Sequence, residues 1–475
     1  MSIQSGANEI ISDAEAGVIP PPGTGLLARA AELVARSGVS PAMLKGAVWS
    51  MGGTASGLVA SFVTQVILAR SLEATRYGIY SYLLGWVNVA VLVGKLEFDN
   101  VAVRFVGTYV GQRQDGLLHG FLRYARRVVA TSTTAVALVA ALAAWLLQPR
   151  LHAGIGGGVW AAGVLVPLTA LLAFTSSSLQ GFSKVPQAQL PTLVLRPVLF
   201  GLAVVLTGAG FGIQLGAGMA VTLNAAATAV ALGVSLFLLG RAVPASVVAA
   251  KPVFDAAKWM HAARGFIVIA AALLILSQQA DILVVGTLLG PRDAGLYSAA
   301  SQVASMVGFG AAAIIFVILP IVADLHARDR GAELQRLVVR TTQACVAVSV
   351  PVVVLLFVAG HFVLHVYGSA FVDAYPVMLV LAIANLIGVT IGLPGNLLPI
   401  TGHAWEASRV IVGTALLNLA LTFVLTPRFG AMGAATATLV AQVTKVGLLR
   451  WYAWRYLSVA AFLWLPAERR GAEDA

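Results

Sequence analysis

The sequence has little charge for its length: only 10% of its 475 residues are Asp, Glu, Lys or Arg, whereas 59% are hydrophobic. A soluble domain carries about 25% charged residues. Water therefore cannot be the main solvent for this chain, and there is little room for a soluble catalytic domain. Apolar runs of about 20 residues, the length that crosses a bilayer core, recur along nearly the whole sequence.

The sequence also has only one cysteine, Cys345. A single cysteine excludes an intrachain disulfide, so the fold cannot depend on an oxidising compartment. Because Cys345 lies in an apolar stretch, we expect it to pack in the core. Residues 1–45 carry acidic side chains and a proline-rich break instead of a basic region followed by a short apolar one, so no cleaved signal is expected.

Catalytic and metal-binding signatures are scarce. His361 and His365 have the spacing of a zinc-binding helix, but Phe362 stands where a metalloprotease needs glutamate, and no third ligand is evident. The glycine-rich run 208–212 follows an apolar helix and lacks the Gly-Lys-Ser/Thr ending of a phosphate-binding loop. The sequence therefore predicts no cofactor and no metal site, and it disfavours ATP hydrolysis within this chain.

What the chain does have is a series of twelve long apolar runs separated by polar turns, which predicts an all-α integral membrane protein. The predicted spans lie near residues 46–70, 77–98, 121–147, 157–180, 190–208, 213–240, 264–289, 295–320, 341–366, 373–395, 407–426 and 430–452.

Lys and Arg are distributed unevenly between the two sides of these spans. Cytoplasmic loops hold the excess of Lys and Arg, and 21 of these residues fall on the side of both termini against 5 on the other. We therefore expect both termini to be cytoplasmic. This asymmetry, together with anionic lipid headgroups, explains the net charge of +11, so no nucleic-acid partner is needed.

The two halves of the chain resemble each other. Residues 72–81 match residues 289–298 at a constant offset of 217, and weaker echoes pair 116–127 with 331–342 and 180–183 with 401–404. Six plus six helices in the same order predict parallel repeats related by an axis along the membrane normal. The expected organisation is a cytoplasmic extension (1–45), an N-terminal six-helix lobe (46–240), a cytoplasmic linker (241–263), a C-terminal six-helix lobe (264–452) and a cytoplasmic or interfacial tail (453–475).

A few polar side chains fall inside the predicted spans, where each charge costs at least about 2.5–3.5 kcal/mol and normally faces a wet cavity. The candidates for a cavity that binds an anion are Arg196, Lys95, Arg409, Lys445, Asn385 and Asn418. Snorkelling to the headgroups is the competing interpretation for the lysines and for Arg409, which lie near span ends, whereas Arg196 lies deeper.

A second set of polar residues lies within predicted span 264–289. Asp281, with Gln278 and Gln279 beside it, is the one acidic residue well inside a span. It is a candidate for a coupling centre that responds to protons or cations, or for a structural partner of an arginine.

Several segments resemble Wzx-type polysaccharide or O-antigen flippases of the multidrug/oligosaccharidyl-lipid/polysaccharide exporter superfamily. The resemblance covers about residues 45–450 and is carried by 68–72, 77–80, 101–105, 281–286, 294–298 and 430–435. It implies a V-shaped, two-lobed transporter in a bacterial inner membrane that flips an undecaprenyl-diphosphate-linked oligosaccharide, for O-antigen or exopolysaccharide, to the outer leaflet. It also implies a cationic cavity for the diphosphate, contact with membrane lipids, and polysaccharide polymerase machinery as a partner.

Other functions fit the same composition. A multidrug or small-solute antiporter would share the architecture, but a drug-cation antiporter should favour buried carboxylates, and only Asp281 lies deep in a span. A lipid II flippase would usually have two further spans. A membrane-embedded polysaccharide polymerase or ligase should carry a large outer loop with catalytic residues, which the predicted topology lacks. We therefore expect a transporter that works by alternating access, and not an enzyme.

Overall fold

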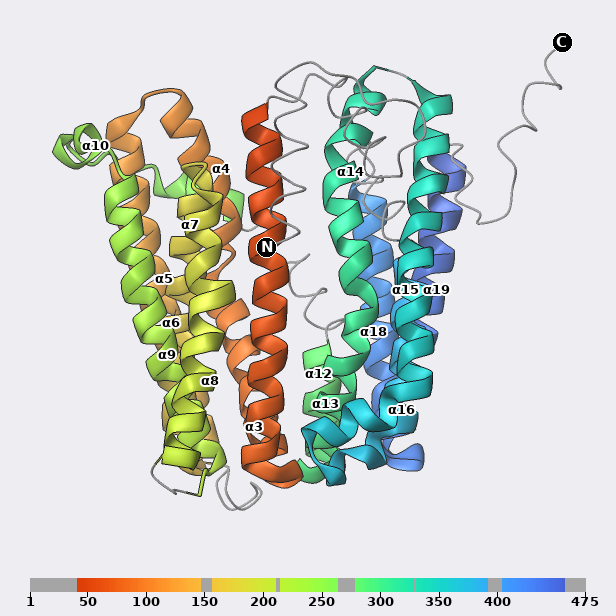
Figure 1. The fold of residues 1–475 in the computed structure, drawn as a ribbon. Coiled ribbons are helices and arrows are strands. Elements are labelled where there is room, and N and C mark those ends of the chain that lie inside the picture. Colours follow the sequence, from red (N-terminus) through yellow and green to blue (C-terminus); the bar gives the residue numbers. More distant parts are fainter. Residues whose placement is uncertain are drawn as a thin grey trace, which may run out of the picture.

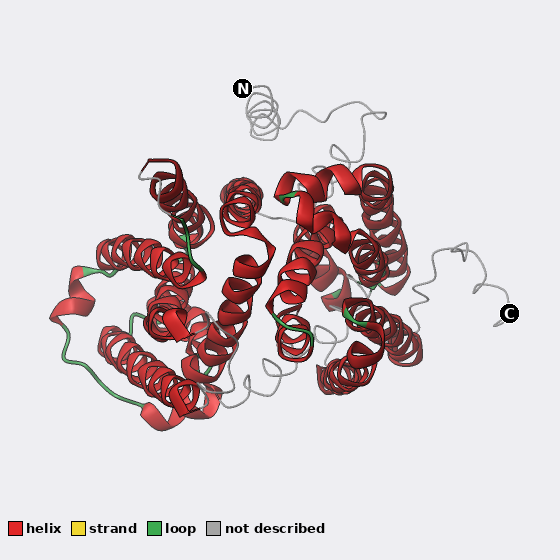
Figure 2. Ribbon diagram, turned by 90° about the horizontal axis from the view of Figure 1, so that it is seen from below, coloured by secondary structure: helices red, strands yellow, loops and turns green. Residues whose placement is uncertain are grey.

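The computed structural model describes residues 41–146, 156–210, 214–263, 278–328, 330–391 and 404–457. Every regular element in these ranges is a helix, as the views from the side (Figure 1) and along the helix axes (Figure 2) show. Nine helical stretches in this part of the chain are long and apolar enough to cross a membrane. The protein is therefore a multi-pass membrane protein.

The helices form two bundles that stand side by side (Figure 1). The N-terminal lobe contains α3 (Pro41–Lys95), α4 (Phe98–Gly111), α5 (Asp115–Leu146), α6 (Gly156–Gly181), α7 (Val185–Gln189), η2 (Leu190–Leu195), α8 (Arg196–Val205), η3 (Leu206–Gly210), α9 (Ala217–Ala242) and the short α10 (Ala245–Ala249). The C-terminal lobe contains α12 (Gln278–Leu288), α13 (Pro291–Ser305), η4 (Met306–Gly308), α14 (Phe309–Ala327), α15 (Gly331–Tyr367), η5 (Ser369–Ala374), α16 (Tyr375–Val389), α18 (Ala404–Phe429) and α19 (Ala431–Leu457).

Two of the nine stretches each contain two predicted spans. Helix α3 is interrupted at Glu73, whose φ of 61° and ψ of 170° are not helical. Gly430 separates α18 from α19 with a φ of 62°, a conformation that glycine adopts without steric cost. Predicted span 264–289 is described only from residue 278 onward, so the total of twelve spans stays a prediction.

The sequence analysis missed helix α4, which it placed in a loop. Val101, Phe105 and Tyr109 are buried and recur at helical spacing on one face. Polar residues between them keep the segment below the hydropathy of a membrane span, although its one apolar face is enough to hold it as a helix. Helices α5 and α15 begin at Asp115 and Gly331, earlier than the predicted span starts at residues 121 and 341. Their first turns carry charged residues, so the hydropathy of these turns is too low for a predicted membrane span.

The two lobes meet mainly through α3. Gly78 of α3 lies against α13, and a Cβ at this position would overlap the carbonyl oxygen of Pro291. Gly295 of α13 lies against α3, where a Cβ would overlap the carbonyl oxygen of Ala74. Only glycine lets two helix backbones approach so closely. The two glycines are equivalent at the offset of 217, so matching segments of the two halves lie side by side.

Further contacts of the lobe junction lie near the bend of α3. The Nε of Arg70 donates a hydrogen bond to the carbonyl oxygen of Val366 at 2.6 Å. The rings of Tyr77 and Phe371 meet edge to face at 5.6 Å between centroids. In Figure 1 this bend lies at the bottom, whereas α4 and α10 lie at the top. The lobes are therefore joined at the end opposite α4 and α10.

The described part of the predicted linker packs against the N-terminal lobe. Trp259 is fully buried, and its Nε1 donates a hydrogen bond to the hydroxyl of Tyr109 at 3.0 Å. The backbone N–H of Val253 donates to the carbonyl oxygen of Gly116 at 2.9 Å. The described part of the predicted linker is therefore held against the N-terminal lobe.

Candidate functional site

Arg196 lies in a hydrogen-bonded group that we call the N-terminal polar centre: Arg196 of α8, Asn224 of α9 and Tyr80 of α3. The Nε and Nη2 of Arg196 donate to the Oδ1 of Asn224 at 3.4 and 3.3 Å. The Nδ2 of Asn224 donates to the hydroxyl of Tyr80 at 2.9 Å. Three separate helices therefore position the guanidinium group.

The local backbone explains where Arg196 sits. It follows the π-helical turn η2 (Leu190–Leu195) and precedes Pro197. Proline cannot donate a backbone hydrogen bond, and π turns recur at functional sites. The carbonyl oxygen of Pro197 accepts a hydrogen bond from the Oγ1 of Thr64 at 2.8 Å, which ties this irregular segment to α3.

Arg196 keeps capacity to bind an anion. The guanidinium has five N–H donors, and its hydrogen bonds within the described residues all go to one neutral amide oxygen. No carboxylate in this part of the chain pairs with it, and the side chain is half-buried. A planar donor fork of this kind matches a phosphate or carboxylate group.

Asp281 lies in a second group, the C-terminal polar centre: Asp281 of α12, Tyr297 of α13, Asn418 of α18 and Thr438 of α19. Asp281 is 2% exposed. Its Oδ1 accepts a hydrogen bond from the Nδ2 of Asn418 at 3.0 Å. Its Oδ2 accepts from the hydroxyls of Thr438 at 2.8 Å and of Tyr297 at 3.1 Å. The structure thus unites Asp281 with Asn418, which the sequence analysis had assigned to different sets.

The two centres share part of their framework. Tyr80 and Tyr297 are related by the offset of 217, and each belongs to the centre of its own lobe. Asn224 is the eighth residue of α9, and Thr438 is the eighth residue of α19. Four residues of these centres were not predicted as site residues: Tyr80, Asn224, Tyr297 and Thr438. The Tyr-Ser pair that occurs at 80–81 and again at 297–298 was a usable signal for the two tyrosines.

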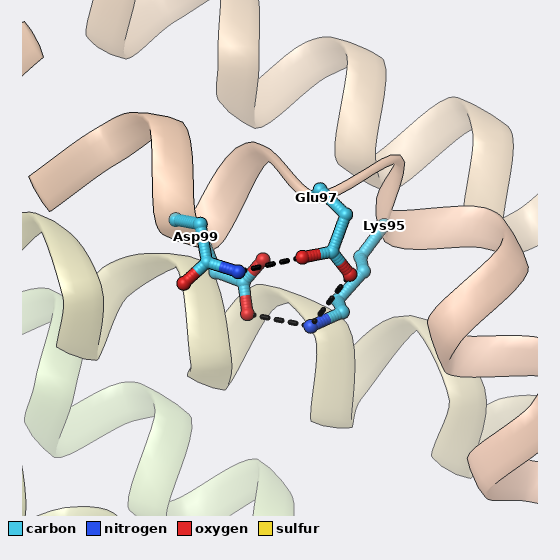
Figure 3. A network of polar contacts seen from close by, with 4 residues as sticks. Lys95, Glu97 and Asp99 are labelled. Atoms are coloured by element: carbon cyan, nitrogen blue, oxygen red, sulfur yellow. Dashed lines mark hydrogen bonds and ion pairs between the residues drawn. The ribbon is translucent and has the colours of Figure 1, made fainter. Parts of the chain in front are cut away.

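Lys95 is neutralised by two neighbouring carboxylates at the junction of α3 and α4 (Figure 3). Its Nζ lies 2.6 Å from the Oδ2 of Asp99 and 3.3 Å from the Oε1 of Glu97. Asn100 donates a further hydrogen bond to Glu97 at 2.6 Å. Since two negative charges face one positive charge, this cluster adds no net positive charge to an anion site.

The remaining candidates lie apart from both centres. Arg409 is exposed and stacks on Trp405 with its Cζ 5.2 Å from the ring centroid, an arrangement typical of anchoring at a membrane interface. Lys445 is half-buried on α19, with no hydrogen bond or ion pair to other described residues. Asn385 donates to the carbonyl oxygen of Leu381 in its own helix at 3.0 Å. Gln278 and Gln279 begin α12, and their side chains lie outside the described part of the chain.

Metal-ligating side chains do not cluster within the described residues. The ring of His361 stacks on that of Tyr375 with 3.7 Å between centroids. Packing against Tyr375 therefore explains the position of the His361 side chain.

The sequence matches a family model described as "Polysaccharide biosynthesis protein" over residues 43–326, more than half of the chain. It is also 23% identical over 180 residues to a probable low-salt glycan biosynthesis flippase from Haloferax volcanii. That alignment covers 38% of each protein, so the chain spans well under half the length of this relative.

Solved transporter structures share the fold. An inward-facing multidrug transporter of the MATE family and MOP superfamily has a TM-score of 0.62 at 12% identity, with 87% of this chain and 95% of that chain covered. A MOP superfamily transporter from Pyrococcus furiosus has a TM-score of 0.55 at 10% identity, with 89% and 96% covered. At such identities the likeness shows the fold alone. The predicted resemblance is confirmed: the chain belongs to the polysaccharide biosynthesis protein family and has the fold of MOP superfamily transporters.

Proposed function

We propose that this protein is a flippase that moves an undecaprenyl-diphosphate-linked oligosaccharide from the inner to the outer leaflet of a bacterial cytoplasmic membrane. The single observation that carries this proposal is the half-buried guanidinium of Arg196, whose described partners are neutral. Membership in the polysaccharide biosynthesis family supports a glycan as cargo, and the name of the Haloferax relative supports flipping as the activity.

The geometry of the N-terminal polar centre suits a ligand that binds reversibly. The distances of 3.3 and 3.4 Å between Arg196 and Asn224 lie beyond the usual 2.7–3.2 Å of an N–H···O hydrogen bond. A diphosphate can replace this weak contact with shorter, charge-assisted hydrogen bonds. When the ligand leaves, the amide oxygen of Asn224 again accepts from the guanidinium, so the cation is never left without an acceptor.

The way the lobes are joined supports alternating access as the mechanism. Their described contacts lie near the bend of α3, and the distribution of Lys and Arg assigns that end to the outer side. We infer an inward-facing state with both termini in the cytoplasm. Release to the outer leaflet then requires the lobes to separate where Gly78 packs against α13 and to approach each other at the inner end.

We further propose that the C-terminal polar centre couples transport to a proton or a cation. Asp281 lies away from water and is held by donors from three other helices. The Oδ1 of Asn418 is buried without a hydrogen-bond partner among the described residues. A change in the charge of Asp281 would alter the contacts between α12 and its neighbours, which is how a bound ion biases a conformational equilibrium.

The competing function is a multidrug or small-solute antiporter with the same fold. Deletion of the gene, followed by analysis of surface polysaccharide and of lipid-linked intermediates, separates the two. For the flippase we expect loss of surface glycan and accumulation of complete repeat units on the cytoplasmic side, both restored by the wild-type chain. Normal surface glycan together with a changed drug tolerance would overturn the proposal.

A further inference from the structure

The N-terminal lobe contains an apolar groove between α3, α5 and α6, with a volume of about 380 Å³. Ligand pockets commonly range over about 300–1,000 Å³. Apart from Tyr82 and Trp86, the lining residues in the described part of the chain are leucine, valine, alanine and glycine. The groove is therefore suited to hydrocarbon and not to a sugar or a diphosphate.

Small side chains create this space. On α5 the wall is formed by Ala137, Ala140, Ala141 and Ala144, which recur at helical spacing along one face. The floor is closed by buried side chains of the neighbouring helices, such as Leu83 at 4% exposure. Unfilled space beside such a wall forfeits dispersion contacts, so a lipid chain that enters the groove gains them.

The outer lip of the groove is open. Trp86 and Val93 line it and are 51% and 55% exposed. Because α3, α5 and α6 are long and apolar enough to cross the membrane, this opening faces the bilayer. A chain can therefore enter sideways from the lipid.

One end of the groove lies at the lobe junction. The hydroxyl of Tyr82 lies 3.2 Å from the Oγ1 of Thr287 in the C-terminal lobe. Tyr80, two residues earlier on α3, belongs to the N-terminal polar centre. Two residues of helix rise correspond to about 3 Å along the axis and about 200° around it. The groove and the polar centre thus lie at a similar depth on different sides of α3.

We propose that this groove holds the polyprenyl chain of the lipid-linked substrate while the diphosphate is bound at Arg196. The inference rests on the proposed function. Both places adjoin α3 at a similar depth, so one lipid with a long chain can reach both. The tail is then held by the same lobe that binds the charged group.

The shape of the groove favours a polyprenyl chain over the acyl chain of a phospholipid. A polyprenyl chain carries a methyl branch on every unit, so it is thicker than a straight acyl chain. The alanine wall of α5, with Gly163 of α6 facing it in the lining, leaves room for such branches. The straight acyl chain of a phospholipid lacks these branches and would gain fewer contacts with the wall.

Gly163 offers a clean test. It lines the groove, and a Cβ built there meets no atom within 4 Å. Gly163→Leu therefore adds a side chain to open space and also raises helix propensity, so the protein should fold. The matched control is Gly233→Leu on α9, an exposed position with equally open surroundings that does not line the groove.

The measurement is native mass spectrometry of the purified full chain with undecaprenol, which lacks a phosphate, in competition with phosphatidylglycerol. We expect the wild type and Gly233→Leu to retain undecaprenol preferentially. Each excluded methylene changes a binding constant by roughly fourfold, so the exclusion of about two methylenes by the new side chain should make Gly163→Leu retain roughly fifteenfold less undecaprenol. Equal retention by Gly163→Leu and wild type, or no preference of the wild type for undecaprenol over phosphatidylglycerol, would overturn the inference.

Arg196→Ala separates this inference from the proposed function. Undecaprenol has no charge, so its retention should be the same in Arg196→Ala and in wild type if the groove binds the chain. Normal glycan export by Arg196→Ala would remove the proposed headgroup site while leaving a Gly163-dependent chain site intact. Loss of export in Arg196→Ala, together with equal retention of undecaprenol by Gly163→Leu and wild type, would support the headgroup site and overturn the chain site.

Discussion

The two polar centres share a matched tyrosine but are built around different residues, Arg196 of α8 in one and Asp281 of α12 in the other. Each centre contains a tyrosine at the matched position, Tyr80 or Tyr297, and a polar residue eight positions into α9 or α19. The N-terminal centre holds an arginine, whose contacts of 3.3 and 3.4 Å reach one amide oxygen. The C-terminal centre holds Asp281, which accepts three hydrogen bonds of 2.8–3.1 Å.

The two centres therefore differ in whether the protein itself satisfies their charged residue. The carboxyl oxygens of Asp281 accept three hydrogen bonds from the protein's own donors, so this centre is satisfied without a diphosphate. Arg196 has N–H donors that bond to no other described residue, so its centre can bind an anionic ligand. We therefore expect changes at Arg196 to affect substrate binding most, and changes at Asp281 to affect stability and turnover.

The largest effect should come from Arg196→Ala. Hydrogen bonds to charged groups contribute about 1.5–3 kcal/mol each, so the loss of two should weaken binding of a polyprenyl diphosphate about a thousandfold. Binding to the purified protein can be measured by isothermal titration calorimetry. Arg196→Lys should recover part of the affinity, since it keeps the charge but loses the planar fork. Unchanged affinity in Arg196→Ala would contradict the assignment.

Asp281→Ala should lower stability by about 3 kcal/mol, because a buried donor without an acceptor costs about 1–3 kcal/mol and three donors lose theirs. The apparent melting temperature of the detergent-solubilised protein reports this change. Asp281→Asn keeps one acceptor oxygen, so its loss should be smaller. Affinity for the diphosphate should stay near wild type in Asp281→Asn, and a large loss of affinity there would break the division between the centres.

The two tyrosines allow a matched comparison. Tyr297→Phe removes a donor to a carboxylate and should destabilise the protein by about 1.5–3 kcal/mol, whereas Tyr80→Phe removes a neutral hydrogen bond and should cost about 1 kcal/mol. Both changes keep the ring and its packing. The same melting assay ranks them, and a larger loss in Tyr80→Phe would argue against the stronger internal satisfaction of the C-terminal centre.

The smallest effect should follow Arg409→Ala. This side chain is exposed and touches Trp405 at the surface, and substitutions of this kind usually change stability by within about 0.5 kcal/mol. Binding of the diphosphate should also be unchanged. A loss of affinity comparable to that of Arg196→Ala would return Arg409 to the site.

Most of the spans could be predicted from the sequence because hydropathy is summed over neighbouring residues. Helix α6, expected near 157–180, is found at Gly156–Gly181. Helix α4 escaped this criterion, since its one apolar face is averaged out over a window. The pairing of Lys95 with Asp99 does not follow from helical spacing, because Leu96 and Glu97 lie between them with positive φ and interrupt the helix.

The sequence by itself determined that the chain is a membrane protein and where most of its long apolar helices lie, and it predicted which segments of its two halves correspond. It also singled out Arg196 and Asp281, since a charge in a bilayer is costly wherever it occurs. Only the tertiary structure decided their partners: Asn418 lies 137 residues from Asp281 along the chain, and Asn224 and Tyr80 lie on different helices from Arg196. Hydropathy is a local property, whereas a hydrogen bond between helices depends on which faces meet, and that is set by packing of the whole bundle.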